Sequence, residues 1–353
     1  MNYTVSFMFR AIPLAMMAVC VGLGLYVWTA GETPGDFVAG RVVTFLGAIC
    51  LCLFCTAVVI IRQLIGRYTT LDRVVYPMIG YMAAAGTAAY GASLFVGAPS
   101  TGLNEQYVAG HVVFGLGLIS GCVATVAMAS TKFLLIPENS QSAEGHHRVP
   151  SAAFPQAAVL VLSAIPVVLS IVAWYFAIAN LAMSTTPGRF TVGHITVGLA
   201  AICTSLIALV LTILRQVQNA YVQRDRIMWP WLVIAMGSLS MIWGIVVLVF
   251  DGDSYLTPGF VMVGLGLVCF SILSKVGLLA LVWRRTFSLA NRVPLIPVVT
   301  ALACLFLAAF VFQAAVADAN AYIAARVLVG LGAICFCLYS IVSILESGTS
   351  SSE

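Results

Sequence analysis

Long apolar stretches recur along the whole chain, and short polar connections separate them. A helix needs about 20 consecutive apolar residues to cross the hydrocarbon core of a bilayer. Backbone groups in that core must also be hydrogen-bonded within their own segment, which favours helices. The pattern therefore predicts an all-α polytopic membrane protein with ten transmembrane helices. We expect them at residues 8–29, 37–61, 76–98, 107–131, 157–181, 191–214, 229–250, 257–283, 293–316 and 322–345.

The even-numbered stretches share a sequence motif. Its copies begin 70, 83, 66 and 66 residues apart, and the first residue, called position 0 here, is small in each copy: Gly40, Gly110, Gly193, Gly259 and Ala325. Position +6 is a leucine in every copy: Leu46, Leu116, Leu199, Leu265 and Leu331. Such a match at one offset in five places predicts an internal repeat of two helices.

A two-helix unit crosses the membrane an even number of times, so all copies of it enter in the same sense and form parallel repeats. We expect these repeats at residues 8–66, 74–136, 157–218, 229–285 and 293–346, within a single transmembrane domain of residues 1–353. Five parallel hairpins could close into a ring with pseudo-fivefold symmetry. A side-by-side bundle is the alternative.

Small residues occupy positions 0 and +7 of the motif, which lie about 20° apart around a helix. Small residues allow helix backbones to approach closely in lipid, where no hydrophobic force drives helices together. We therefore interpret the motif glycines as helix-packing residues and not as ligand contacts: Gly40, Gly47, Gly110, Gly117, Gly193, Gly259, Gly266 and Gly332.

Composition and charge agree with a membrane protein and predict its orientation. The chain is 62% hydrophobic and only 8% charged, which excludes a soluble globule. Of its 16 Lys and Arg residues, all but Arg41, Arg189 and Arg326 fall on one side of the predicted spans. The positive-inside rule then places both termini in the cytoplasm. The longest connection, residues 137–156, becomes a flexible cytoplasmic loop.

Position +1 of the motif carries polar side chains near the outer face in four copies: Arg41, His111, His194 and Arg326. Imidazole titrates near pH 6.5, so two histidines at one level would gain charge as the outside becomes acidic. We predict that the four side chains form a pH-responsive collar at an outer mouth. The alternative is that each of them reaches the lipid headgroups separately.

Lys275 is a charge in the predicted hydrocarbon region and occurs in only one copy, nine residues before Arg284. Nine residues correspond to roughly 13 Å along a helix. A charge at that depth costs roughly 3 kcal/mol and usually indicates function. We predict that Lys275 lies on a substrate pathway. The alternative is that its long stem carries the ammonium to the cytoplasmic interface.

Other chemistries lack the residue patterns that they need. We find no nucleophile elbow, no phosphate loop and no histidine–glutamate spacing for a metal, and therefore predict no enzyme, no metal and no cofactor. No basic face with interleaved aromatic residues predicts nucleic-acid binding. All ten cysteines lie in apolar segments, where we expect them to act as small, inert hydrophobes.

Five segments together resemble the YhiM-like inner-membrane proteins of enteric bacteria: FVAGRVVTFLGAIC, YVAGHVVFGLG, FLLIPENS, SKVGLLALVWRRTFSLANRVPLIPV and ARVLVGLGAICFCLYSIVSILESG. The likeness extends over nearly the whole chain and is most specific from Ser274 to Val298. The resemblance implies a bacterial inner-membrane location and a role in survival at low pH. The family's pattern has a histidine where this chain has Arg41.

Together these features predict a channel- or transporter-like membrane protein that supports survival in acid. Its expected partners are the lipid bilayer and a small ion or small-molecule substrate, and the oligomeric state is left open. The alternative is a non-transporting membrane protein that binds a partner or lipid in stress response or envelope organisation. A polar path past Lys275 would favour transport, whereas a solid core would favour the alternative.

Overall fold

In the computed structural model, the described residues are 3–65, 67–100, 104–132, 154–250, 256–282, 293–314 and 319–350. They form ten α-helices: α1 Tyr3–Ala30, α2 Pro34–Leu64, α3 Thr70–Phe95, α4 Glu105–Ser130, α5 Gln156–Ala182, α6 Pro187–Val217, α7 Gln223–Phe250, α8 Leu256–Val282, α9 Leu295–Ala314 and α10 Ala319–Ser350. The predicted all-α class is confirmed.

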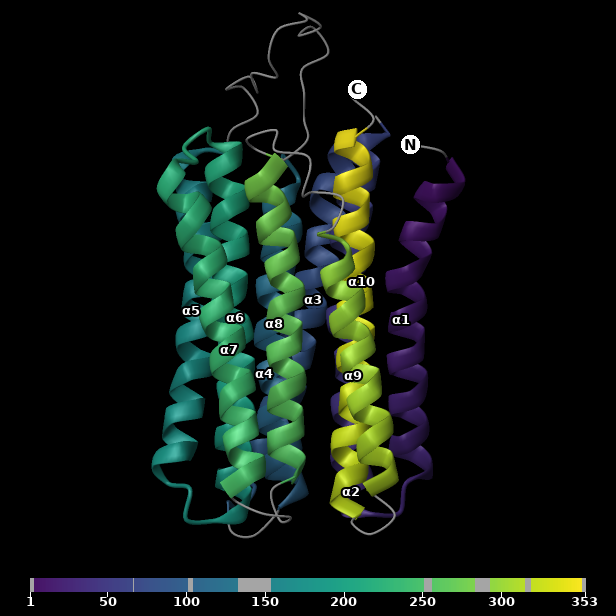
Figure 1. Ribbon diagram of the computed structural model, residues 1–353, viewed down its shortest axis with the longest axis vertical. Helices are drawn as coiled ribbons and strands as arrows, with labels where there is room; N and C mark the ends of the chain where they lie inside the picture. The colour runs from purple at the N-terminus through teal and green to yellow at the C-terminus, as the bar shows by residue number, and fades with distance from the viewer. Residues whose placement is uncertain are drawn as a thin grey trace, which may run out of the picture.

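Nine of these ten helices are long and apolar enough to cross a membrane, judged by length and composition. The tenth is α3, which is rich in Ala, Gly and Tyr, so that the membrane crossing expected at 76–98 stays a prediction. The helices lie side by side along the long axis of the molecule, and α1 begins at the same end at which α10 finishes (Figure 1). Most of the flexible loop expected at 137–156 lies outside the described residues.

The helices form an inner and an outer layer. In the apolar windows of α2, α4, α6, α8 and α10, between 67% and 89% of the residues are buried. The corresponding share is only 22–33% in α1, α5, α7 and α9. The even-numbered helices therefore make the core, and the odd-numbered helices surround it and expose large apolar side chains such as Leu160, Leu302 and Phe306.

Contacts between the helices form a closed cycle. Among the inner helices, α2 contacts α4, α4 contacts α6, α6 contacts α8, α8 contacts α10, and α10 contacts α2. Each outer helix packs on its own hairpin partner and on the inner helix before it. α3 thus lies against α4 and α2, and α1 lies against α2 and α10. The last hairpin consequently contacts the first.

Glycines and leucines of neighbouring inner helices fit into each other. A Cβ added to Gly115 of α4 would lie 2.5 Å from a methyl carbon of Leu199 in α6, which is too close for two carbon atoms. The space beside Gly198 of α6 is filled in the same way by Leu265 of α8. Gly330 of α10 is occupied by Leu46 of α2. The position +6 leucine thus packs into the position +5 glycine of the preceding copy.

Local sequence signals explain where several helices begin. Thr33 caps α2 and Thr69 caps α3, each in a capping box with an aspartate three residues later. These caps start both helices several residues before the expected spans. The second aspartate, Asp72, also pairs with Arg62 at the end of α2. The equivalent pair two hairpins later joins Arg215 and Asp225, with 3.1 Å between nitrogen and oxygen.

The close approach of helices within a hairpin generates a prediction for Gly110. A Cβ added there would lie 2.6 Å from the backbone nitrogen of Phe95 in α3, and backbone cannot move aside cheaply. We expect Gly110→Ala to lower the free energy of unfolding by about 1–3 kcal/mol, as overpacking does. Thermal or denaturant unfolding in detergent measures the change.

Gly86→Ala is the matched control, because an added Cβ at exposed Gly86 of α3 meets no atom within 4 Å. That substitution should leave stability unchanged or raise it by up to about 1 kcal/mol, since alanine is the better helix former. Equal losses in both variants would contradict the packing interpretation.

Candidate functional site

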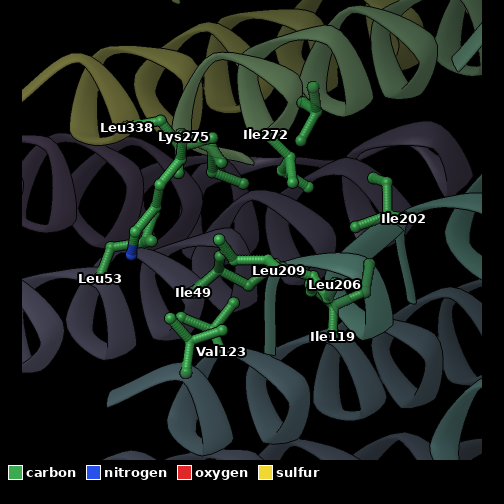
Figure 2. A pocket seen from close by; sticks show the side chains of 13 residues that line it. Ile49, Leu53, Ile119, Val123, Ile202, Leu206, Leu209, Ile272, Lys275 and Leu338 are labelled. Carbon is green, nitrogen blue, oxygen red and sulfur yellow. The ribbon is translucent and has the colours of Figure 1, made fainter. Parts of the chain in front are cut away.

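The five inner helices enclose a small cavity. It is lined by side chains of α2, α4, α6, α8 and α10: Ile49, Leu53, Ile119, Val123, Val126, Ile202, Leu206, Leu209, Val268, Ile272, Lys275, Ile334 and Leu338. Figure 2 shows these side chains directed into a common space. The volume open to a water-sized sphere is about 20 Å³. A water molecule needs roughly 10–15 Å³ by this measure, so the cavity has room for about one.

Two complete sets of apolar side chains close the space. The first set stands at position +9 of the motif: Ile49, Ile119, Ile202, Val268 and Ile334. The second set stands at position +13, about one helical turn further: Leu53, Val123, Leu206, Ile272 and Leu338. Each inner helix contributes one residue to each set. In this conformation the described residues offer no continuous polar path along the axis.

Among the described residues, Lys275 is the one with a charge that lines the cavity. It is 1% exposed, and among the described residues it is the largest side chain that is fully buried. Its side chain extends from α8 toward Leu53 of α2 (Figure 2). No described residue forms a hydrogen bond or an ion pair with its ammonium group. The side chain thus points into the centre of the bundle.

The positions equivalent to Lys275 in the other copies carry no charge. They are Thr56, Val126, Leu209 and Ile341, and all four are buried. Thr56 donates its hydroxyl hydrogen bond to the carbonyl of Cys52 in its own helix, 3.0 Å away. The lysine is therefore a single departure from an otherwise apolar or internally satisfied level of the core.

The two arginines of the predicted collar lie in separate places. Arg41 donates to the Tyr90 hydroxyl over 3.1 Å, and its guanidinium lies over the rings of Phe37 and Trp28. It also lines a cavity of about 420 Å³ at the ends of α1, α2 and α4. Arg326 of α10 forms an ion pair with Asp36 at the start of α2. The ion pair between Arg326 and Asp36 joins the last hairpin to the first.

The two histidines are buried among aromatic rings. His111 lies 4.3 Å from the ring centres of both Phe95 and Tyr107, and it also contacts Phe176 of the next hairpin. His194 lies 4.1 Å from Phe190. It also lies near the ring of Trp243 in the next hairpin. Each imidazole also contacts the backbone carbonyl four residues earlier in its helix.

The described contacts therefore do not bring the four collar residues together. Arg41, His111, His194 and Arg326 have different neighbours, and none of them lines the central cavity. Arg326, His111, His194 and Arg41 instead contact residues of the following hairpin in the cycle. Their positions mark the joints between hairpins.

The predicted packing glycines all lie on inner helices, each against the outer helix of its own hairpin. An added Cβ at any of them would meet atoms of that helix at 2.6–3.4 Å: Gly40, Gly47, Gly110, Gly117, Gly193, Gly259, Gly266 and Gly332. At Gly40 and Gly117 the nearest atoms belong to the backbone of Trp28 and Ala88. Ligand contact at these glycines is therefore limited by the neighbouring helix.

Thiol and hydroxyl groups connect all five inner helices just beside the apolar sets. Each contact joins position +10 of one copy to position +12 of the copy before it: Cys50 with Cys337, Ser120 with Cys52, Cys203 with Cys122, Cys269 with Ser205, and Cys335 with Ser271. The contact between Cys50 and Cys337 joins the first and last copies. The described residues contain no group of three or more potential metal ligands.

Sequence reasoning missed both the apolar sets and these thiol and hydroxyl contacts between positions +10 and +12. A signal for each was present, because position +9 is Ile or Val in every copy. Positions +10 and +12 are likewise always Cys or Ser. Treating each cysteine as an isolated small hydrophobe conceals this shared spacing.

Comparisons with known proteins cover the whole chain. A family model described as "Protein of unknown function (DUF2776)" matches residues 1–350. The chain is also 44% identical over 350 residues to "Inner membrane protein YhiM" of Escherichia coli (strain K12), which covers 99% of both chains. The predicted resemblance to YhiM-like proteins is confirmed.

The isolation of Lys275 generates a prediction about stability. Lys275→Met keeps the length of the side chain and removes a buried charge that no described residue pairs. We expect the free energy of unfolding to rise, by up to roughly 3 kcal/mol, which is the cost of a charge at membrane depth. Reversible unfolding in mixed micelles measures it.

The reciprocal variant, Leu209→Lys, places a charge at the equivalent buried position of α6. It should lose a similar amount of stability. A loss of stability in Lys275→Met would mean that the lysine makes a structural contribution that its surroundings do not explain.

Proposed function

The chain belongs to the family described as protein of unknown function (DUF2776), and from this premise we propose that it is a channel- or transporter-like protein of the bacterial inner membrane. Its pathway runs along the centre of the inner helices. The single observation that carries this proposal is the placement of Lys275, the one charge among the described residues that line the central cavity, against apolar side chains contributed by all five inner helices. A buried charge with this placement is costly and usually functional.

The closed contact cycle supports a ring of five duplicated hairpins with pseudo-fivefold symmetry. The same pairs of motif positions meet at successive joints, glycine with leucine and thiol with thiol or hydroxyl. The joint between the last and first copies uses these pairs as well, through Gly330 with Leu46 and Cys337 with Cys50. A ring places its axis at the cavity, where a pathway would pass.

The two apolar sets support a closed state of that pathway. Hydrophobic constrictions in channels block ions by excluding water, and a small widening rewets them. Ile49 and its four equivalents would form one constriction, and Leu53 and its equivalents the other.

The role in acid survival rests on the family resemblance, and the joints between hairpins are where pH would act. His111 and His194 are buried at these joints against aromatic rings. Protonation there would place a new cation between two hairpins. At His111 this cation would also lie near the positive charge of Arg189. Both termini and the end of the bundle nearest Lys275 would face the cytoplasm, where most Lys and Arg lie.

The alternative is a non-transporting membrane protein that binds a partner or lipid. The small volume and apolar lining of the central cavity favour it, because a solid core conducts nothing. Flux measurements separate the two functions.

Widening and wetting one constriction tests the transport proposal. We expect Leu206→Asn, at the centre of the second apolar set, to raise ion leak several-fold in proteoliposomes that report chloride, potassium and protons separately. The control, Leu160→Asn, places the same polar group on the outer surface of α5, where Leu160 is 73% exposed. Equal, background-level flux in both reconstituted variants would favour the non-transporting alternative.

A cross-link between the first and last repeats tests the ring. In a variant that keeps only Cys50 and Cys337, with a protease site inserted after residue 140, copper phenanthroline should join the two fragments through a disulfide, because these thiols are in contact. Gel electrophoresis after cleavage should show one band that reduction splits into two.

The matched variant keeps Cys50 and Cys203, which occupy the same motif position on α2 and α6, two steps apart in the cycle. It should stay unlinked. A side-by-side bundle would leave Cys50 and Cys337 unlinked as well.

A further inference from the structure

We propose that the central cavity beside Lys275 binds one small, weakly hydrated monovalent anion of the size of chloride or bromide. This inference rests on the proposed function, because it assigns a substrate class to the same pathway. It also stands on an observation of its own, a buried lysine side chain that points into a cavity with no acidic partner among the described residues.

The surroundings of Lys275 leave few ways to compensate its charge. The twelve other residues that line the cavity are Ile, Leu or Val, and their side chains have no atom that could accept a hydrogen bond from the Lys275 ammonium. The three ion pairs among the described residues use Arg62, Arg215 and Arg326, which lie elsewhere. An uncompensated charge in low dielectric is strongly unfavourable. A mobile counter-ion fills the role that a carboxylate fills in other buried pairs.

A water molecule is a poorer occupant of the same space. The cavity holds about one water-sized sphere. A buried water is stable only with about 2–4 polar partners, and here the ammonium is the single polar group of the lining. A monatomic anion needs only the charge contact. It therefore gains more from this cavity than a water molecule does.

Size and hydration select the class of anion. The cavity of about 20 Å³ excludes sulfate, phosphate and organic acids in this conformation. Its apolar walls cannot replace the hydration shell of a strongly hydrated ion such as fluoride, whose desolvation is the more costly. A single positive charge matches a single negative one. Chloride and bromide satisfy all three conditions, and lysine side chains line anion pathways in other pores.

The experiment measures equilibrium binding to the purified full-length protein in detergent, without any transport. Radioactive chloride is used in equilibrium dialysis at constant ionic strength, with sodium gluconate as the balancing salt, and bromide, fluoride and sulfate serve as competitors. We expect one chloride per chain, displaced by bromide and at least ten-fold less effectively by fluoride or sulfate.

The chain contains two lysines, which provides a matched control. Lys275→Met should weaken chloride binding at least ten-fold, whereas Lys132→Met removes the same charge away from the cavity and should bind as the native chain does. Lys275→Arg should retain binding, because it keeps the cation. Thermal unfolding of each variant verifies that it is folded.

Chloride binding that is absent from the folded native chain, or unchanged in Lys275→Met, would overturn the anion site. The result is separable from the fate of the proposed function. Flux through Leu206→Asn without chloride binding would keep the pathway and remove its anion. Chloride binding without any flux would keep the site and remove the pathway.

Discussion

Close approach between helices is the constraint on which this structure depends. In a bilayer the lipid tails are as apolar as leucine, so helices gain by association only where their surfaces fit tightly. Here small residues at positions 0 and +7 let each inner helix meet its hairpin partner. A glycine at position +5 receives a leucine from the neighbouring inner helix. The inner layer is buried because the first contact repeats in all five hairpins and the second at four of the five joints, with Phe45 in place of the glycine in α2.

The same constraint explains why the centre of the bundle is nearly solid. Five helices that pack closely around one axis leave only the space that their inward side chains do not fill. Branched residues at positions +9 and +13 fill most of it, and about 20 Å³ remains. Lys275 occupies this space at a level where the other copies carry Thr, Val, Leu and Ile. The core thus combines uniform packing with one exception, the lysine at this level.

The helices and the packing glycines could be predicted from the sequence, because hydrophobic length and small-residue spacing have direct physical causes. The positions of the histidines could not. Residues about two turns into a helix, such as His111 and His194, can reach water, lipid or a neighbouring helix. Only the placement of Phe176 and Trp243 on the next hairpin decides among these. The meeting of Cys50 with Cys337 likewise depends on closure over nearly 290 residues, which no local pattern specifies.

The joint between the first and last hairpins has a consequence for biosynthesis. Arg326, Gly330 and Cys337 all lie on α10, and each meets a residue of α2. Since a chain is synthesised from its N-terminus, this joint cannot form until nearly the whole protein has been translated. During that interval Lys275 enters the bilayer on α8 while one wall of its cavity is still unmade. The cavity around Lys275 is therefore completed only when α10 brings Ile334 and Leu338 to its lining.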